Sequence, residues 1–373
     1  MKLLFFNPKG LVPKEGESRD QKSILIIFLV SLLFFVAVKV IPFKGMEGRK
    51  QEMLEASGIM QEALSILKDC RNRLEVTINK EDDPNQTGLI GVRYSPLTTS
   101  LGHLEAKRTT TNPNFAALVV SLLKEVGVRR GETIAAGASS SFPSLIVAVL
   151  SAAKAMGVKL LMINSFGASQ WGANRLDFHW LHMHDCLEKA GIFETKPIAV
   201  SLGGDRDTGE EMGEEIRAKL RSEAEERGLF FIDEPDLAKN VNLRLTLYEA
   251  NASDPIQAFV NIGGSWPNIG TDASVLELKP GLTRRKRIPS PKNGGLIHRM
   301  AAQNIPVIHL LHIRGLAGRY GLPWDPVPLP GPGEGRIYLR AREKHPLFMI
   351  LSGGYLFFVF VFIIGSRRRK RSL

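Results

Sequence analysis

Small polar groups follow four apolar runs of strand length, and they are the residues best suited to bind or attack a ligand. They are Ser139, Ser140 and Ser141; Asn164 and Ser165; Gly203, Gly204 and Asp205; and Gly263, Gly264 and Ser265. Backbone N–H groups in such loops bind carboxylates and phosphates, and an activated serine hydroxyl is a nucleophile. A single loop of this kind is usually only a tight turn. Four of them after strands favour one shared site.

Two histidines are the candidate bases for a nucleophilic serine. His309 lies in the apolar run 307–311 and His312 directly follows it, so both belong to a predicted strand end. The catalytic candidates are therefore Ser139, Ser140, Ser141, His309 and His312. The loop after Gly137 lacks the second glycine of a nucleophile elbow, so no motif supports hydrolysis by one of these serines.

Three cations lie close in sequence to the loops or strand ends and are candidate partners for an anionic ligand. Lys107 and Arg108 belong to a polar segment, whereas Arg314 follows a predicted strand directly. A solvated surface is the usual place for a Lys–Arg pair. Arg314 is the preferred anion partner because it follows the strand, and its forked guanidinium matches the two oxygens of a carboxylate.

Cofactor motifs are absent from the sequence. There is no P-loop pattern and no G-x-G-x-x-G after a strand, so no cofactor is expected. His179 and His182 share one face of a predicted helix that also contains His184, and the pair could hold a metal ion. No third ligand is evident from the spacing. We therefore expect ordinary surface histidines and no metal.

The scaffold is clearest around the first serine loop. An apolar run at 133–136 enters a small-residue turn, and a helix follows with Ser141 as its predicted N-cap. Pro143 fits the first turn of this helix and Gly157 its end. The run at 158–163 is then a second buried strand. Strand, helix and strand form one βαβ unit.

Three further apolar runs repeat the pattern, at 198–202, 258–262 and 307–311. We therefore predict an α/β fold with a Rossmann-like, mostly parallel sheet of about five strands or more and helices on both faces. Ligands of such sheets bind outside the carboxyl ends of the strands. The four loops should consequently converge in one crevice.

Helical periodicity marks two helices outside this pattern. Residues 112–127 predict an amphipathic helix capped by Asn112. Residues 47–78 predict one long helix with an apolar stripe, which is either a stalk that contacts a partner or a helix laid against its own domain. The polar run at 80–86 predicts a linker to the globular part.

Two long apolar runs predict membrane helices, at 24–41 and 347–365. The length of each run is close to the about 20 residues that a helix needs to cross a bilayer. No small-residue cleavage site follows the first run, which favours an uncleaved anchor. The predicted order is a cytoplasmic tail at 1–22, a span at 23–41, a stalk helix and linker at 42–87, an α/β domain at 88–345, a span at 346–365 and a basic tail at 366–373.

The distribution of charge supports this topology. The 373-residue chain carries a net charge of +11, and most of the excess lies in the two tails, including residues 367–371. Because basic residues flank membrane helices on the cytoplasmic side, both termini are predicted in the cytoplasm of a bacterial inner membrane, with the main domain outside. Because most of the excess positive charge lies in the tails, nucleic-acid binding is a poor explanation for it. Cys70 and Cys186 are expected to be unrelated thiols, with an outer-face disulfide as the alternative.

Four segments together resemble the bacterial poly-gamma-glutamate system protein family. They are TTSLGHLEAKRTTTNPNFAAL at 98–118, GASSSFPSL at 137–145, SFGASQWGAN at 165–174 and SLGGDRDTG at 201–209, and the similarity covers residues 88–315. Members of this family are encoded with the machinery that makes and exports poly-γ-glutamate: an ATP-dependent ligase, a small membrane subunit and an exposed export component. The resemblance implies a pathway and assigns no catalytic residue.

Two functions follow as expectations. In the first, the protein is a membrane-anchored accessory component of poly-γ-glutamate synthesis or export, and its partners are the anionic polymer, the membrane and the other proteins of the system. The predicted ligand-binding residues are Lys107, Arg108, Ser140, Asn164, Gly203, Gly204, Asp205, Gly263, Gly264, Ser265 and Arg314. In the second, the protein is an outer-face amide hydrolase or transferase that acts on the polymer or on cell-wall peptide.

Overall fold

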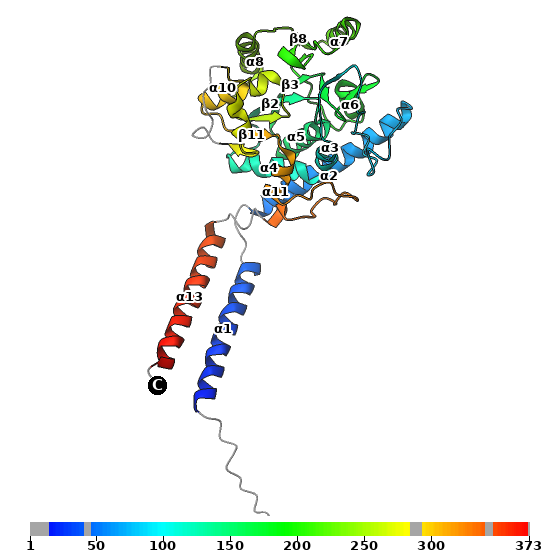
Figure 1. The fold of residues 1–373 in the computed structure, drawn as a ribbon. Coiled ribbons are helices and arrows are strands. Elements are labelled where there is room, and N and C mark those ends of the chain that lie inside the picture. The colour runs from blue at the N-terminus through cyan, green and yellow to red at the C-terminus, as the bar shows by residue number, and fades with distance from the viewer. Residues whose placement is uncertain (1–14, 41–45, 284–292, 340–345, 372–373) are drawn as a thin grey trace, which may run out of the picture. The chain divides into compact units, whose positions relative to one another are not determined.

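The computed structural model describes residues 15–40, 46–283, 293–339 and 346–371. These residues divide into two compact units, an α/β unit within Gly48–Arg340 and a second unit formed by the two terminal segments (Figure 1). The helices are α1 (Glu15–Val40), α2 (Met46–Arg73), α3 (Leu104–Thr110), α4 (Asn114–Glu125), α5 (Pro143–Met156), α6 (Trp180–Lys189), α7 (Glu214–Glu226), α8 (Leu237–Asn251), α9 (Trp266–Ile269), α10 (Leu296–Ala302), α11 (Ile313–Tyr320) and α13 (Pro346–Arg371), with short helical turns η1 (Asp205–Asp207) and η2 (Ala273–Glu277).

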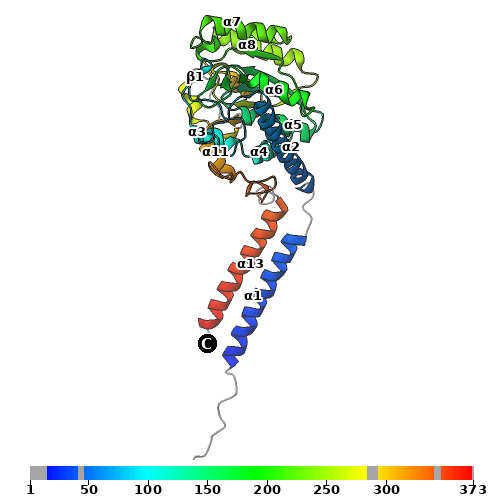
Figure 2. The same ribbon diagram turned by 90° about the vertical axis from the view of Figure 1, so that its right-hand side faces the viewer.

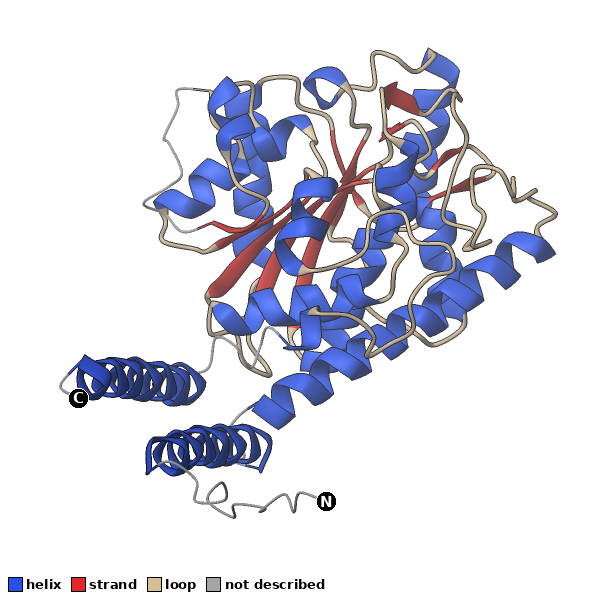
Figure 3. Cartoon of the chain, turned by 60° about the horizontal axis from the view of Figure 1, so that its bottom comes forward, coloured by secondary structure: helices blue, strands red, loops and turns tan. Residues whose placement is uncertain are grey.

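A seven-stranded sheet forms the centre of the α/β unit, with helices on both sides (Figure 3). In spatial order its strands are β10 (Gly281–Thr283), β11 (Val307–Leu310), β9 (Ile256–Ile262), β2 (Thr133–Ser139), β3 (Lys159–Ser165), β7 (Ala199–Ser201) and β8 (Phe230–Ile232). All neighbours are parallel except β10, which runs antiparallel to β11. The predicted α/β class with a mostly parallel sheet is therefore confirmed.

The winding of the sheet reverses beside its first strand. The chain passes outward from β2 through β3 and β7 to β8, and then returns to the other side of β2 with β9 and continues to β11. Parallel sheets open a crevice at such a reversal, because the connections on its two sides lead away from each other. Here the reversal lies between β2 and β9. The five predicted strands all occur, and β8 and β10 are additions that sequence reasoning missed.

Alternating burial explains why β2 is central. Ile134, Ala136 and Ala138 belong to one apolar cluster, which also contains buried residues of α2, α4 and α5. Ala135 belongs to the other cluster, together with residues of α8 and α10. Successive side chains of a strand point to opposite faces. A run of small and branched apolar residues therefore fits a strand that is covered on both faces.

The helix ends follow the predicted signals in part. Gly157 ends α5 in the left-handed conformation, at a φ of 61°, and Pro143 begins it. Ser141 is not its cap, because Phe142 occupies that position and the Ser141 side chain bonds elsewhere. The Asn112 carboxamide oxygen accepts from the backbone N–H of Asn114 at 3.0 Å, but Pro113 occupies the N-cap position of α4, so the predicted cap is one residue too early.

The predicted stalk is instead a part of the α/β unit. Figures 1 and 2 both show α2 beside α4. The apolar stripe of α2, which includes Met53, Met60 and Leu67, is fully buried in the core. Arg49 donates to the carbonyl of Ser121 in α4 at 2.6 Å. The stalk interpretation is therefore wrong, because the stripe that suggested a partner contact is covered by the protein's own domain.

A disulfide and a buried arginine fix the end of α2. Cys70 in α2 is bonded to Cys186 in α6, with their Cα atoms 6.2 Å apart, so the expectation of unrelated thiols is wrong. The two cysteines are 116 residues apart in sequence, and only the packing of α2 on the domain brings them together. The predicted linker is also anchored, because the Arg71 guanidinium donates to four carbonyls between residues 76 and 90.

The terminal unit contains the membrane-helix candidates. Within the described residues, α13 is the one helix long and apolar enough to cross a membrane, over Phe348–Gly365. The apolar part of α1 described here, Ile24–Ala37, is shorter than a span. The sequence predicted two spans, so the structure supports only the second by length. The two helices contact each other, because the Ser31 and Tyr355 hydroxyls are 2.7 Å apart.

Candidate functional site

The loops predicted to converge line one cavity at the reversal of the sheet. A Cβ atom built on Gly263 after β9 would lie 3.1 Å from the Cβ of Ser139, at the end of β2. A Cβ atom on Gly203 would lie 3.0 Å from the Cβ of Ser165, at the end of β3. Glycine at these two positions thus allows neighbouring strand-end loops to approach closely. The four loops therefore belong to one site.

We call this hollow the strand-end cavity. It has a volume of about 640 Å³, within the range of small-molecule sites. The strand-end loops contribute Ser139, Ser141, Ser165, Gly204, Asp205, Gly264, Ser265 and His312. Other segments contribute His103, Lys107, Ser169 and Glu211. Ser140, Asn164, Gly203 and Gly263, which the sequence also singled out, are not among its lining residues.

A small second sheet brings further segments to the cavity. Strand β1 (Thr98–Ser100) pairs with β4 (Ala168–Ser169), so Ser100 lies opposite Ser169. This pairing joins the segment before α3 to the loop after β3. Because α3 begins four residues after β1 ends, it is held at the cavity as well. Sequence reasoning missed Ser169, which is part of the segment 165–174 but follows no predicted strand.

Lys107 in α3 supplies the cation of the cavity. Its side chain is 3% exposed, and its ammonium donates to the Ser141 carbonyl and, at 2.6 Å, to the Ser169 hydroxyl. It also lies 3.8 Å from the centre of the Phe142 ring. Among the described residues, no carboxylate forms an ion pair with it. Burial therefore lowers the pKa of Lys107 to about 7.

The serines form a connected set beside this amine. The Ser139 and Ser141 hydroxyls are 2.8 Å apart, and the Ser141 hydroxyl accepts from the backbone N–H of Ser169 at 2.9 Å. The Ser140 hydroxyl donates to the Ser165 carbonyl, so it links two strand ends instead of facing the cavity. Unlike Ser139, Ser140 and Ser141, Ser169 thus has a hydroxyl that contacts the amine of Lys107.

A buried ion pair holds the loop after β7. Asp207 accepts from Arg244 at 2.6 Å, and its second oxygen accepts from the Ser201 hydroxyl at 2.8 Å. Both charged side chains are almost fully buried. Asp207 has a φ of 64° and Arg206 a φ of 49°, which costs strain in residues other than glycine. The pair therefore fixes a strained loop that places Asp205 at the cavity.

The structure does not form the predicted serine–histidine pair. His309 is fully buried, and its Nδ1 atom lies 2.9 Å from the Asn261 carboxamide nitrogen. Burial lowers its pKa to about 4. His312 lines the cavity and is exposed. No hydrogen bond joins either histidine to a serine in the described part of the chain.

The other predicted cations lie outside the cavity lining. Arg108 makes a two-pronged contact with Asp325, at 2.7 and 2.5 Å, and this contact raises its pKa. Arg314 is exposed, with its guanidinium 5.7 Å from the centre of the Trp324 ring. Lys107 therefore replaces Arg314 as the preferred partner for an anionic ligand. Lys107 differs from its neighbour Arg108 in being buried, which the sequence could not show.

The fold is an α/β domain with a cavity where the winding of the sheet reverses, which is the usual place of ligand sites in such sheets. No known protein family, curated protein or solved structure matches the chain. The cavity residues and their contacts are therefore the basis for a functional proposal.

Proposed function

We propose that the protein is a membrane-anchored accessory component of poly-γ-glutamate synthesis or export, and that the strand-end cavity binds a γ-glutamyl segment of the polymer. The buried amine of Lys107 carries this proposal. A buried ammonium without a counterion is costly, and an anion from a ligand offsets that cost. A γ-glutamyl carboxylate supplies such an anion.

The family resemblance and the cavity coincide, and this supports the same function. Each of the four resembling segments contributes lining residues: Lys107 from 98–118, Ser141 from 137–145, Ser169 from 165–174 and Asp205 from 201–209. The parallel sheet alone brings the strand-end loops together, so the support comes from the resemblance extending to the lining residues, Lys107 and Ser169 included. The resemblance therefore concerns the same residues that form the site.

The cavity lining also limits what the ligand can be. Asp205 and Glu211 line it together with Lys107, so a ligand carboxylate is attracted beside Lys107 and repelled beside the two acidic side chains. A γ-glutamyl chain offers one carboxylate per unit and an amide N–H that can donate to an acidic group. We therefore propose that one carboxylate contacts Lys107 and that the amides face the acidic side.

The affinity for the ligand is expected to fall as the pH rises above 7. Only protonated Lys107 attracts a carboxylate, and its pKa of about 7 means that the charged fraction decreases above neutrality. The decrease should approach about tenfold per pH unit. Calorimetric titration of the full chain in detergent with N-acetylated γ-glutamyl trimers, from pH 7 to 9, measures it. An affinity that stays constant over this range contradicts the role of Lys107.

A second candidate function is amide hydrolysis or transfer, and one contact favours it. Lys107 is partly neutral near pH 7 and lies 2.6 Å from the Ser169 hydroxyl. It could take the hydroxyl proton while Ser169 attacks an amide carbonyl, and return the proton to the leaving amine as the C–N bond breaks. The acyl group left on Ser169 would then pass to water in hydrolysis or to an acceptor amine in transfer. Ser169, and not Ser139, Ser140 or Ser141, would be the nucleophile.

Ser169→Ala separates the two functions. If the cavity is catalytic, this change should abolish release of glutamate or of shorter oligomers from γ-glutamyl peptides and leave their affinity within about tenfold, since one hydroxyl contact is worth about 0.5–1.5 kcal/mol. Chromatography of the peptides after incubation measures the products. Wild-type protein that binds the oligomers and releases nothing supports the binding role alone.

We further propose that both tails are cytoplasmic and that the α/β unit lies outside a bacterial inner membrane. The length of the α13 span, the basic residues after it and the Cys70–Cys186 disulfide support this, since disulfides persist in oxidising compartments. The first span, through α1, remains part of this proposal. Protease added to spheroplasts should digest the α/β unit and spare epitope tags on both tails; digestion of the tags contradicts the orientation.

A further inference from the structure

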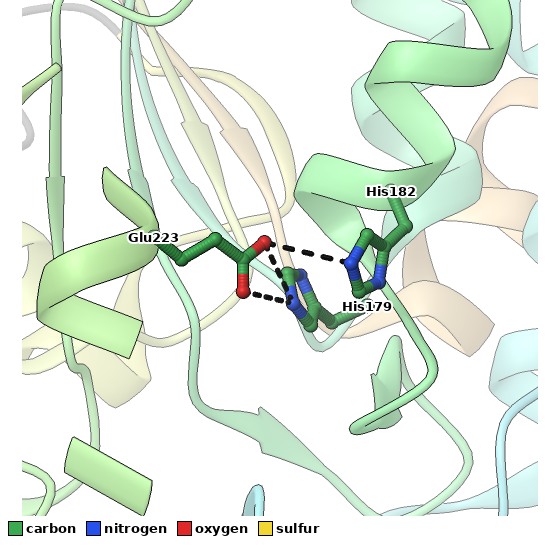
Figure 4. Close-up of side chains that lie close together, drawn as sticks. All are labelled: His179, His182 and Glu223. Carbon is green, nitrogen blue, oxygen red and sulfur yellow. Dashed lines mark hydrogen bonds and ion pairs between the residues drawn. The ribbon is translucent and has the colours of Figure 1, made fainter. Parts of the chain in front are cut away.

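Two histidines and a glutamate from separate elements converge away from the residues that line the strand-end cavity (Figure 4). His179 ends β6 (Phe178–His179), His182 lies in the first turn of α6, and Glu223 lies in α7. From the sequence we expected ordinary surface histidines and no metal, because no third ligand was evident beside His179 and His182; His179 is instead buried. Glu223 adds a third possible donor, and no spacing rule could have revealed it because it follows 41 residues after His182 in another helix.

The three side chains present their donor atoms to one another. The Nε2 atoms of His179 and His182 lie 3.2 and 3.6 Å from the same oxygen of Glu223. One donor atom from each residue lies within 4.8 Å of the other two. The second distance is too long for a hydrogen bond, so His182 faces the carboxylate without bonding to it. Figure 4 shows both rings directed at the carboxylate.

These separations match the edges of a tetrahedron around a metal ion. Zinc binds imidazole nitrogen at about 2.0–2.1 Å and carboxylate oxygen at about 2.0–2.2 Å. Tetrahedral angles then require donor atoms about 3.3–3.5 Å apart. The distances from Glu223 to the two imidazoles bracket this value. The third edge, between donor atoms of the two imidazoles, is no longer than 4.8 Å, so an ion could enter the cluster if the rings move closer together.

Burial and access also suit a bound ion. The exposed fractions of the side chains are 1% for His179, 13% for Glu223 and 30% for His182. His182 in addition lines a second cavity of about 410 Å³, beside the disulfide. The buried residues thus shield the ion, while the His182 side leaves room for water as a fourth ligand. Two histidines, one glutamate and one open position are a ligand set known in zinc enzymes.

The surrounding charges distinguish this cluster from its neighbour. Arg227 contacts Glu223 at 3.1 Å and Asp185 at 2.9 Å, so it can remain on Asp185 when Glu223 turns to an ion. In the adjacent group of His184, Asp185 and Glu188, each member already has a partner, since His184 bonds the Thr195 carbonyl and Glu188 pairs with Lys196. The adjacent group is therefore held by partners from outside it, whereas the His179–Glu223 hydrogen bond lies within the first cluster.

We propose that His179, His182 and Glu223 form a binding site for one divalent transition-metal ion, with Zn²⁺ the best fit. The ion would connect α6 to α7. The chain between these two helices contains the Gly203–Asp205 loop, which belongs to the strand-end cavity. Its ligands come from two elements that are distant in sequence, so binding should stabilise the native packing. This inference is independent of the ligand proposed for the cavity.

The test uses Co²⁺ as a spectroscopic probe and the full chain in detergent, stripped with a chelator beforehand. We expect one Co²⁺ per chain with the intense visible absorption of a tetrahedral ion, its displacement by one equivalent of Zn²⁺, and a higher melting temperature with Zn²⁺. His182→Ala and Glu223→Gln should each weaken Zn²⁺ binding by more than about tenfold, the least that loss of even a supporting residue costs.

Glu225→Gln is the matched control, because Glu225 is an exposed carboxylate on the same helix. Its affinity for Zn²⁺ should equal that of the wild type. Absence of a stoichiometric Co²⁺ site in the wild type overturns the proposal. Binding that persists unchanged in both His182→Ala and Glu223→Gln also overturns it, because the ion would then be held elsewhere.

Discussion

Lys107→Met is expected to weaken binding of γ-glutamyl oligomers by about 30-fold or more, the loss of about 2–5 kcal/mol seen when one partner of a buried charge pair is removed. The same change should leave the free energy of unfolding equal to that of the wild type or raise it by up to about 3 kcal/mol. Replacing a buried charge by an apolar side chain of similar volume removes its desolvation cost. Titration calorimetry and denaturant unfolding of the full chain measure the two quantities.

Arg314→Lys is the control for this prediction. Arg314 stacks near Trp324 outside the cavity lining, so its replacement should leave the affinity unchanged. A loss of stability in Lys107→Met together with unchanged binding would assign Lys107 a structural role. A loss of binding in Arg314→Lys would indicate that the anion binds at the end of β11, as the sequence first suggested.

Replacing both Cys70 and Cys186 by serine is expected to lower the free energy of unfolding by about 2–5 kcal/mol. The bond closes a loop across 116 residues and ties the end of α2 to α6. A long closed loop restricts the unfolded chain strongly, which favours the upper part of that range. Urea unfolding under oxidising conditions measures the change.

Reductant gives the matched control for the disulfide. It should destabilise the wild type by a similar amount and have no effect on the double serine variant. If reductant leaves the wild type unaffected, the bond is absent in the isolated protein. The disulfide would then no longer support an extracytoplasmic position for the α/β unit.

The strands and their end loops were accessible to sequence reasoning because their signals are local. A run such as 133–136 is apolar on both faces, and glycine or serine marks where it ends. The order of the strands depends on long-range packing, yet the rule that ligands bind at the carboxyl ends of parallel strands was sufficient to place the cavity. At the opposite ends of the sheet, β10 lacks an apolar run, whereas β8 lies in the apolar run 229–232, which is as long as 133–136 and was overlooked.

The decisive side chains were not accessible because burial separates residues that look alike in sequence. Lys107 and Arg108 are neighbours, yet one is buried beside serines and the other is paired with Asp325. Glu223 is one of many acidic residues in an exposed, highly charged helix. In each case the partner comes from a distant part of the chain. Only the tertiary structure shows which of several similar residues meets it.

The central claim is that a ligand carboxylate pairs with Lys107, and proton uptake on binding tests it most directly. Free Lys107, with a pKa of about 7, is about half protonated at pH 7, and an adjacent carboxylate raises that pKa. Calorimetry with N-acetylated γ-glutamyl trimers in buffers of different ionisation enthalpy should therefore show uptake of about half a proton per chain at pH 7 and more at pH 8. Binding without proton uptake at both pH values would contradict the pairing.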